Sequence, residues 1–247
     1  MGSKSIIFQD DIQMPNPFTF RNKIINGDMR IQQRYSGAKF TNTIASSYQY
    51  AMDRFAMYIA TIGEMSAEVF STTISDSPFL YGISTYGRFK RESAVGAALD
   101  INIIGHGIEG YNISDLNFGT TLAKQFTISF WARASGSYNF SLSLCNTTTG
   151  ASRTYVIPFD VTTTWKKYTY TVTADTTGSW GTGNSLGLHI RFVLGGGGVT
   201  TSFNQWKGDN LYVGGSTQFQ TLATNSYIDI TGLQLEPGTV ATPFADS

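Results

Sequence analysis

Apolar and polar side chains alternate along three short segments of this chain. In residues 138–145, 166–173 and 186–194 every second residue is apolar or aromatic, and most of the residues between them are polar. Successive side chains of a β-strand point to opposite faces of a sheet, so this period of two predicts strands with one face in the core and one toward solvent. The side chains expected to face the core are Tyr138, Phe140, Leu142, Leu144, Tyr168, Tyr170, Val172, Leu188, Ile190 and Phe192.

Two further segments depart from simple alternation. Residues 126–134 are apolar on both faces around Trp131, which is typical of a central strand that is covered on both sides. Residues 227–236 alternate in one phase before Gly232 and in the other phase after it. We predict a β-bulge at this glycine, because one extra residue moves the following side chains to the opposite face.

Turn-rich connections join these segments, and helical patterns are short. Residues 113–116 and 63–70 are the stretches in which we expect helical turns. The simplest fold is an all-β domain over residues 22–247, a single antiparallel β-sandwich (jelly roll) of about eight to ten strands. Residues 1–21 form an extended N-terminal segment, because two prolines at positions 15 and 17 disfavour a helix. This segment is either an arm that lies against a neighbour or against its own domain, or a disordered end.

The composition favours an all-β fold and argues against several functional classes. Aromatic residues make up 14% of the 247 residues and charged residues another 14%, against about 25% charged residues in an average soluble domain. The 17 basic and 17 acidic residues give a formal net charge of zero, so we expect no nucleic-acid partner. No segment approaches the about 18 apolar residues of a membrane helix, and we expect no membrane insertion. The single cysteine, Cys145, is expected to be a small buried residue.

Residues typical of catalytic sites are too scattered to predict an enzyme. His106 and His189 are far apart in the sequence, and neither has partners at a metal-binding spacing. Glycan-cleaving enzymes use two opposed carboxylates, and no spacing selects such a pair here. The carboxylates considered are Asp100, Glu109, Asp115, Asp160 and Asp209. Glu64 and Glu68 would share a face if their segment were helical, but a solvated surface explains them better. We therefore expect no catalytic residue, and a small glycan depolymerase is the remote alternative.

Aromatic residues beside glycine-rich turns indicate sugar binding. Trp180 and Trp206 lie in expected loops, and Tyr212 follows soon after. The apolar faces of sugar rings stack on exposed aromatic rings, while polar side chains bind the hydroxyl groups. His189 and Arg191, on the polar face of their strand, could belong to the same glycan-binding surface. The alternative for the two tryptophans is that they plug the end of the core.

A cation site is a further expectation. Asp28 and Asp229 lie near the two ends of the domain, which antiparallel sandwiches often bring together. Oxygen-rich edges of this kind can hold a hard cation such as calcium. Calcium at these two carboxylates is the one cofactor considered, and no other is expected.

Several stretches in order along the chain resemble a module of bacteriophage tail fibres and related virion proteins. The resemblance covers residues 22 to 244 and is most specific in IEGYNISDL, which is followed by FGT, and in the closing GLQLEPGTVATPF. It is carried further by NKIINGDMRIQQRYSG, YAMDRFAMY, WKKYTYTVTADTTGSW and QWKGDN. The module is similar to the carbohydrate-binding jelly rolls that are appended to glycan-active enzymes.

The resemblance implies a β-sandwich, a location in the virion after assembly in the host cytoplasm, and a role facing a glycan. It carries over no catalytic residue. It also implies a homo-oligomer, a trimer if the chain belongs to a tail appendage. Residues 1–21 are expected to contact other virion proteins, because a short arm can add a strand to an exposed sheet edge. Two functions remain open. One is a tail-fibre-like, receptor-binding component that recognises host surface polysaccharide, and the other is a non-catalytic capsid decoration or tail adaptor protein.

Overall fold

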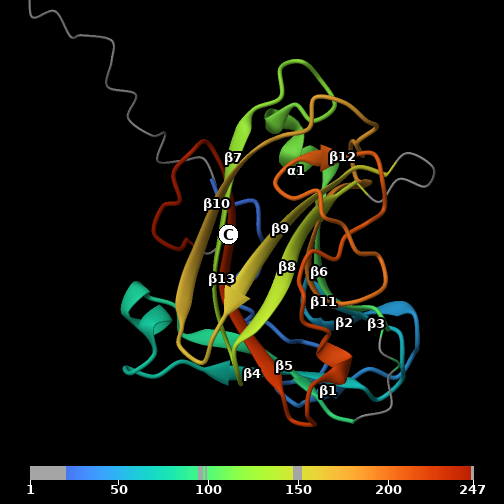
Figure 1. Cartoon of the computed structure of the whole chain (residues 1–247). Helices are drawn as coiled ribbons and strands as arrows, with labels where there is room; N and C mark the ends of the chain where they lie inside the picture. Colours follow the sequence, from blue (N-terminus) through green and yellow to red (C-terminus); the bar gives the residue numbers. More distant parts are fainter. Residues whose placement is uncertain (1–20, 94–96, 98, 147–151, 246–247) are drawn as a thin grey trace, which may run out of the picture.

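The molecule is a sandwich of two antiparallel β-sheets, which lie against each other as two layers in Figure 1. The structure is a computed structural model that describes residues 21–93, 97, 99–146 and 152–245. Nearly all of the predicted N-terminal arm therefore lies outside the described residues. The predicted all-β fold, a single antiparallel sandwich of the jelly-roll kind, is confirmed.

The strands of each sheet come from distant parts of the chain. Across the six-stranded sheet the order is β1 (Phe40–Thr41), β4 (Met65–Ser71), β5 (Thr85–Arg91), β13 (Tyr227–Pro237), β7 (Gln125–Ala134) and β10 (Lys166–Thr173). Across the seven-stranded sheet it is β12 (Trp206–Lys207), β9 (Thr154–Val161), β8 (Tyr138–Cys145), β11 (Leu186–Gly195), β6 (Asn102–Glu109), β3 (Phe55–Ile59) and β2 (Ser47–Met52). The described strands outnumber the expected ones partly because β1 and β12 have only two residues each.

Helical structure among the described residues is limited to single turns. These are η1 (Ser77–Tyr81), α1 (Gly110–Ile113), η2 (Ser114–Leu116) and η3 (Phe219–Thr221). The helical turn expected at 113–116 is confirmed, but the one expected at 63–70 is wrong. Most of that segment is strand β4, because its backbone groups pair with β5 and tertiary pairing outweighs local helix propensity. No described helix has the length and apolar character needed to cross a bilayer.

Aromatic rings from both sheets meet in the core. Phe130 of β7 packs edge-on against Phe192 of β11, with ring centres 4.9 Å apart. Both side chains are almost wholly buried, and removing each from water contributes about 1.5 to 3 kcal/mol. The predicted inward residues of β11 are all buried as well. Strand β7 is covered on both faces as predicted, because Trp131 on its other side packs with Trp165 and neighbouring residues.

The predicted bulge in β13 is confirmed. Thr231 pairs with Trp131 of β7, whereas the next paired residue, Gln234, lies opposite Ser129. Gly232 sits inside this shift with a φ of 61°, a left-handed conformation that glycine adopts without steric cost. The bulge lets the apolar side chains on both sides of Gly232 reach the core.

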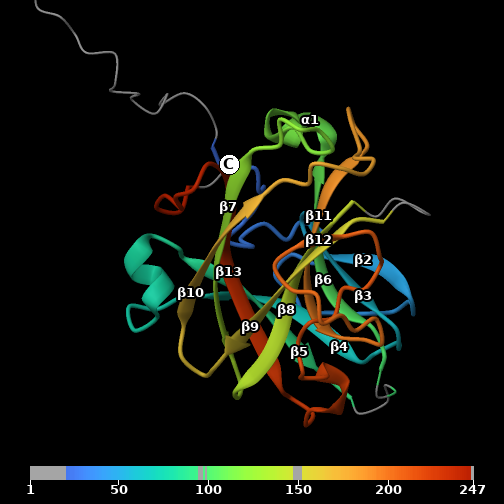
Figure 2. The ribbon, with the colours of Figure 1, turned by 45° about the horizontal axis from the view of Figure 1, so that its top comes forward.

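A long segment between β11 and η3, residues 196–218, crosses the outer face of the seven-stranded sheet (orange in Figure 2). Its backbone binds the sheet below: Ser141 Oγ donates to the carbonyl of Tyr212 at 3.3 Å, and Gly214 N donates to Ser141 Oγ at 3.1 Å. Ser141 and Ser143 are fully buried as a result. The expectation that this polar face of β8 meets solvent is therefore wrong at Ser141 and Ser143, and an uncovered part of the sheet remains toward its β2 edge.

Candidate functional site

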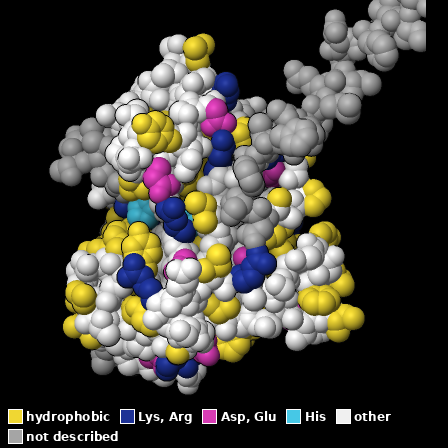
Figure 3. All heavy atoms as spheres, turned by 180° about the vertical axis from the view of Figure 1, so that it is seen from behind, with side chains coloured by type: hydrophobic (Ala, Val, Ile, Leu, Met, Phe, Trp, Pro, Cys, Tyr) yellow, Lys and Arg dark blue, Asp and Glu magenta, His cyan; other side chains and the backbone are white. Residues whose placement is uncertain are grey.

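The uncovered part of the seven-stranded sheet forms a groove of about 280 Å³ across β2, β3, β6 and β11. Figure 3 shows histidine, basic and hydrophobic side chains close together on the side of the molecule opposite to the view of Figure 1. The residues that line the groove are Tyr48, Tyr50, Arg54, Ala56, Gly105, Gly107, Leu186, His189 and Arg191.

Two glycines make the floor of the groove low. In the pairing of β6 with β11, Gly105 lies opposite Arg191, and Gly107 lies opposite His189. A Cβ at Gly105 would be only 2.5 Å from Nε2 of His189. Because both positions lack a side chain, the larger residues beside them form walls around an open backbone floor. One wall is aromatic, since Tyr48 and Tyr50 of β2 expose 39% and 47% of their surfaces.

His189 is held as a neutral hydrogen-bond donor. Arg191 Nε donates to Nδ1 of His189 at 3.2 Å, which leaves the ring proton of the neutral imidazole on Nε2. Burial, and then the charge of Arg191, lower the pKa of His189 to about 3. Among the described residues no acceptor binds its Nε2–H, which points over Gly105. The groove therefore contains an unused donor.

Tyr48 joins the aromatic wall to this polar pair. Its ring lies 5.3 Å from the imidazole of His189 and 5.1 Å from the ring of Tyr58. Burial of its hydroxyl raises the pKa of Tyr48 to about 12, so the phenol stays protonated at neutral pH. The groove thus combines aromatic faces, a glycine floor and neutral donors, a set that suits a ligand with both apolar faces and hydroxyl groups.

A second hollow, of about 490 Å³, continues from the groove. It shares Tyr50 and Arg54 with the groove, and Arg34 lies in it with Cζ 5.3 Å from the centre of the Tyr50 ring. The residues that line it are Ile25, Asn26, Ile31, Gln33, Arg34, Tyr50, Asp53 and Arg54. Tyr50 therefore stands between two connected parts of one surface.

The structure brings three of the five predicted glycan-binding residues together. His189 and Arg191 lie on the face of β11 away from the core, as predicted, but both are buried. His189 packs against the ring of Tyr48 and accepts a hydrogen bond from Arg191. Tyr212, in the segment of residues 196–218, faces the guanidinium of Arg191, with Cζ 5.9 Å from the ring centre. Sequence reasoning missed Tyr48 and Tyr50. The signal for them was the alternation in Ser-Tyr-Gln-Tyr, which places two aromatic rings on one face of a strand.

The two predicted tryptophans lie elsewhere, at the edge of the sandwich. Trp180 and Trp206 are half-buried and pack against each other, 5.2 Å between ring centres, and against Phe118. Each indole is also held by a hydrogen bond: Trp180 Nε1 donates to the carbonyl of Thr177, and Trp206 Nε1 to that of Thr173. The alternative interpretation, in which they plug the end of the core, describes this arrangement.

Asp28 and Asp229, the two residues expected to bind calcium, are each paired with arginine. Asp229 is fully buried, and its two carboxylate oxygens accept hydrogen bonds from Arg88 Nε at 2.8 Å and Arg133 Nε at 2.9 Å. Asp28 pairs with a different cation, Arg30, at 3.3 Å. Both carboxylates are thus already compensated by separate arginines. In the described parts of the chain, no group of three or more His, Cys, Asp or Glu side chains is arranged to hold a metal ion.

The carboxylates considered for catalysis each have a local partner. Their donors are Thr61 for Asp100, Arg54 for Glu109, Lys23 for Asp115, Asn139 for Asp160 and the backbone of Leu211 for Asp209. The expectation that Glu64 and Glu68 share a solvated surface is wrong. Glu64 is fully buried, and burial, followed by the charge of Asp100, raises its pKa to about 7. Glu68 lies on β4 opposite Arg88.

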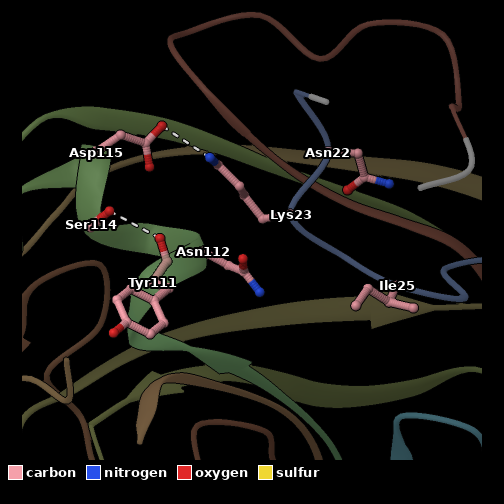
Figure 4. A pocket seen from close by; sticks show the side chains of 7 residues that line it. All are labelled: Asn22, Lys23, Ile25, Tyr111, Asn112, Ser114 and Asp115. Atoms are coloured by element: carbon pink, nitrogen blue, oxygen red, sulfur yellow. Dashed lines mark hydrogen bonds and ion pairs between the residues drawn. The ribbon is translucent and has the colours of Figure 1, made fainter. Parts of the chain in front are cut away.

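A further hollow beside α1 differs from the groove because its polar groups are used internally. Figure 4 shows Lys23 reaching Asp115, with Nζ 3.0 Å from Oδ2, and Ser114 Oγ donating to the carbonyl of Tyr111. Asn22, also on its wall, binds the backbone of Ala245. His106, the second histidine, faces the core and contacts the carbonyl of Ile25.

Comparisons with known proteins give distant structural likenesses only. No protein-family model matches the sequence, and no curated protein matches it. Similar solved structures include one described as "CBM4 structure and function", with 14% identity, 87% of this chain and 99% of that chain covered, and a TM-score of 0.43. A second is the enzymatically active domain of tailspike protein 4 from bacteriophage CBA120, with 11% identity, 88% of this chain but 21% of that chain covered, and a TM-score of 0.46.

A third similar structure is the CBM22-2 xylan-binding domain of Xyn10C from Paenibacillus barcinonensis. It has 14% identity, 74% of this chain and 91% of that chain covered, and a TM-score of 0.39. At these identities and TM-scores the likenesses add nothing to the fold assignment, which rests on the two sheets themselves.

Proposed function

We propose that this chain is a non-catalytic, glycan-binding component of a bacteriophage virion that recognises host surface polysaccharide. The observation that carries the proposal is the groove on the seven-stranded sheet. Exposed rings of Tyr48 and Tyr50 stand beside a glycine floor and beside the free Nε2–H of His189. A pyranose ring needs both kinds of contact, because its apolar face stacks on aromatic rings while its hydroxyl groups require hydrogen-bond partners.

The virion location rests on the sequence resemblance over residues 22 to 244. The same resemblance supports a homo-oligomer, which would be a trimer in a tail appendage. Attachment to other virion proteins through residues 1–21 is proposed because a short arm can add a strand to an exposed sheet edge. A cryo-electron map of the intact particle tests these three points. Density for the chain at the distal end of a tail appendage, with the groove facing outward, is expected. A groove buried between virion proteins would contradict a receptor-binding role.

Binding is tested on an array of bacterial oligosaccharides, followed by titration calorimetry with the glycans that give a signal. Tyr50→Ala is the informative variant, because the ring is 47% exposed and its loss removes stacking without opening the core. We expect affinity to fall about tenfold or more. Tyr81→Ala is the matched control, since Tyr81 is also an exposed tyrosine but lies in η1 on the other sheet. Equal binding by both variants and the unaltered protein would reject the groove as the site.

The absence of catalysis belongs to the same proposal. The purified protein is expected to bind a polysaccharide without shortening it, and a reducing-sugar assay on the bound polymer measures this. Release of reducing ends would favour the remote alternative, a depolymerase. The Glu109→Gln and Asp160→Asn variants would then show whether either carboxylate takes part.

A second candidate, a capsid decoration or tail adaptor protein, is favoured by one observation. The connection between β4 and β5, residues 72–84, projects from the sandwich (Figure 1). It exposes four large apolar side chains, Ile74, Phe79, Leu80 and Tyr81, with Ile74 and Leu80 more than two-thirds exposed. Several large apolar side chains exposed on one connection are typical of protein contacts. Leu80→Asp should then prevent incorporation into particles and leave glycan binding intact, whereas Tyr50→Ala should do the reverse if the first proposal holds.

A further inference from the structure

Arg191 is a buried cation without an acidic partner. Only 9% of its surface is exposed, yet it lines the groove. The described residues form ion pairs through Lys23, Arg30, Lys39, Arg54, Arg88, Lys90, Arg133 and Arg153, and Arg191 is not among them. Arg88 and Arg133, by contrast, are paired with Asp229. Arg91, which is 4% exposed, also has no ion pair, but its Nε donates to the carbonyl of Ser93.

The groups that face Arg191 are neutral. Its Nε donates to His189, its guanidinium lies near the ring of Tyr212, and Tyr48 is close enough to accept a hydrogen bond from it. His189 and Tyr48 are both uncharged at neutral pH, because burial lowers the pKa of the first and raises that of the second. A guanidinium has five N–H donors, so several remain for a ligand.

The charged residues of the wider lining are mostly basic, like Arg191. The charged residues on the wall of the groove are Arg54 and Arg191, and no described Asp or Glu belongs to that wall. Arg54 does bind Glu109 at its exposed rim, at 2.6 Å. The connected hollow adds one basic residue, Arg34, which is exposed and stacks on Tyr50, and one acidic residue, Asp53. The molecule as a whole has no net charge, so this local excess of positive charge is a property of the groove.

A cation removed from water is costly unless an anion or strong acceptors compensate it. At Arg191 the protein supplies one imidazole acceptor, one phenol and one aromatic face, but no carboxylate among its described residues. A planar guanidinium also fits the two oxygens of an oxyanion better than it fits a sugar hydroxyl, since it can bind both at once. The missing charge is therefore best supplied by a ligand that enters from the groove.

We propose that the groove selects acidic glycans and that Arg191 binds the oxyanion, a carboxylate or a sulfate, of one sugar residue stacked beside Tyr48. This inference rests on the proposed glycan-binding function and names the class of glycan. His189 Nε2–H and Arg54 lie on the same wall and bind neighbouring oxygens of the acidic sugar.

The test uses pairs of oligosaccharides that differ in one group. In one pair glucuronic acid replaces glucose, in a second galacturonic acid replaces galactose, and in a third one hydroxyl is sulfated. Each is titrated into the full chain at low and at high salt. We expect the acidic member of at least one pair to bind about tenfold more tightly, with a preference that weakens as salt rises. The carboxylated and sulfated pairs distinguish the two sources of the oxyanion.

Arg191→Gln should abolish this preference, so that the acidic and neutral members bind alike. Lys166→Gln is the control, because Lys166 is an exposed cation on β10 of the other sheet, and it should leave the preference unchanged. If Arg191→Gln does not fold, Arg54→Gln, a change at an exposed residue, should still reduce the preference.

Each outcome is decisive. Equal or tighter binding of the neutral members overturns the selection of acidic glycans but leaves glycan binding at the groove standing. If the preference for acidic glycans survives both Arg191→Gln and Arg54→Gln, the oxyanion is not bound by this wall of the groove, and the proposal is overturned. No binding to any member of the three pairs, and none on the wider array, overturns both proposals together.

Discussion

The backbone of Gly105 and the imidazole of His189 approach so closely that a Cβ on Gly105 would lie 2.5 Å from Nε2. The two residues come from adjacent strands, β6 and β11, and together they set the depth of the groove at its centre. The open floor at its centre therefore requires glycine at position 105.

Gly105→Ala is expected to displace His189 and to fill the floor. We expect glycan affinity to fall about tenfold or more, and overpacking to destabilise the fold by about 1 to 3 kcal/mol. Calorimetric titration and urea unfolding measure the two effects. Gly197→Ala is the control, because a Cβ there would meet only Leu99 at an ordinary 3.8 Å. Unchanged affinity in Gly105→Ala would mean that ligands do not reach the floor.

Trp206 is expected to contribute to stability and not to binding. Its ring closes the edge of the sandwich against Trp180 and Phe118, away from the residues that line the groove. Trp206→Ala should lower the free energy of unfolding by about 3 kcal/mol and leave the affinity of the folded protein unchanged. Urea unfolding measures the loss of stability, and glycan titration at low temperature measures the affinity of the protein that is still folded. A variant of normal stability that had lost binding would restore the glycan-binding role predicted from the sequence.

Asp229 is expected to be essential to the six-stranded sheet. It is fully buried between Arg88 and Arg133. Removal of its charge leaves Arg88 without its anion and leaves Arg133 with Asp76 alone. Asp229→Asn should cost about 3 kcal/mol or more in unfolding free energy. Asp115→Asn, which breaks an exposed pair with Lys23, should cost at most about 1 kcal/mol. Because arginines already compensate Asp229, neither calcium nor a chelator should shift the melting temperature, and a shift on adding calcium would contradict this explanation.

Glu64 is expected to make stability depend on pH. Burial, followed by the charge of Asp100, raises the pKa of its carboxyl from an ordinary 4.5 to about 7, and the nearby Arg91 and Asn102 offset this only in part. The folded protein therefore binds a proton more tightly than the unfolded chain. The stabilisation is complete below about pH 4.5 and is lost as the pH rises through about 7, a change of up to about 3 kcal/mol.

Glu64→Gln isolates this effect, because amide and protonated carboxyl have nearly the same shape. Urea unfolding between pH 4 and 8 should show the variant gaining stability relative to the unaltered protein as pH rises, and Glu68→Gln is the control. The effect must be measured as the difference in unfolding free energy between Glu64→Gln and the unaltered protein, because His106 and His189 change stability with pH in the opposite direction. Burial lowers the pKa of both, so their contribution is lost as pH falls below about 6.5. Parallel pH curves for Glu64→Gln and the unaltered protein would contradict a raised pKa.

The sequence by itself determined the fold class and several strands almost to the residue. The alternation over residues 166–173 became β10 with the same bounds, and the phase change at Gly232 became a bulge. These features are local, since a period of two and a glycine that permits positive φ can be read within ten residues. The error at residues 63–70 has the opposite cause, because β4 exists through pairing with β1 and β5.

The binding surface was decided only by the tertiary structure. Sequence reasoning found His189, Arg191 and Tyr212, but the groove needs Tyr48 and Gly105 as well. Tyr48, Gly105 and His189 are more than fifty residues apart in the sequence at each step. Which side chains share a face within one strand follows from the backbone period. Which strands lie side by side, and which part of a sheet is left uncovered by residues 196–218, depend on long-range pairing that no local pattern encodes.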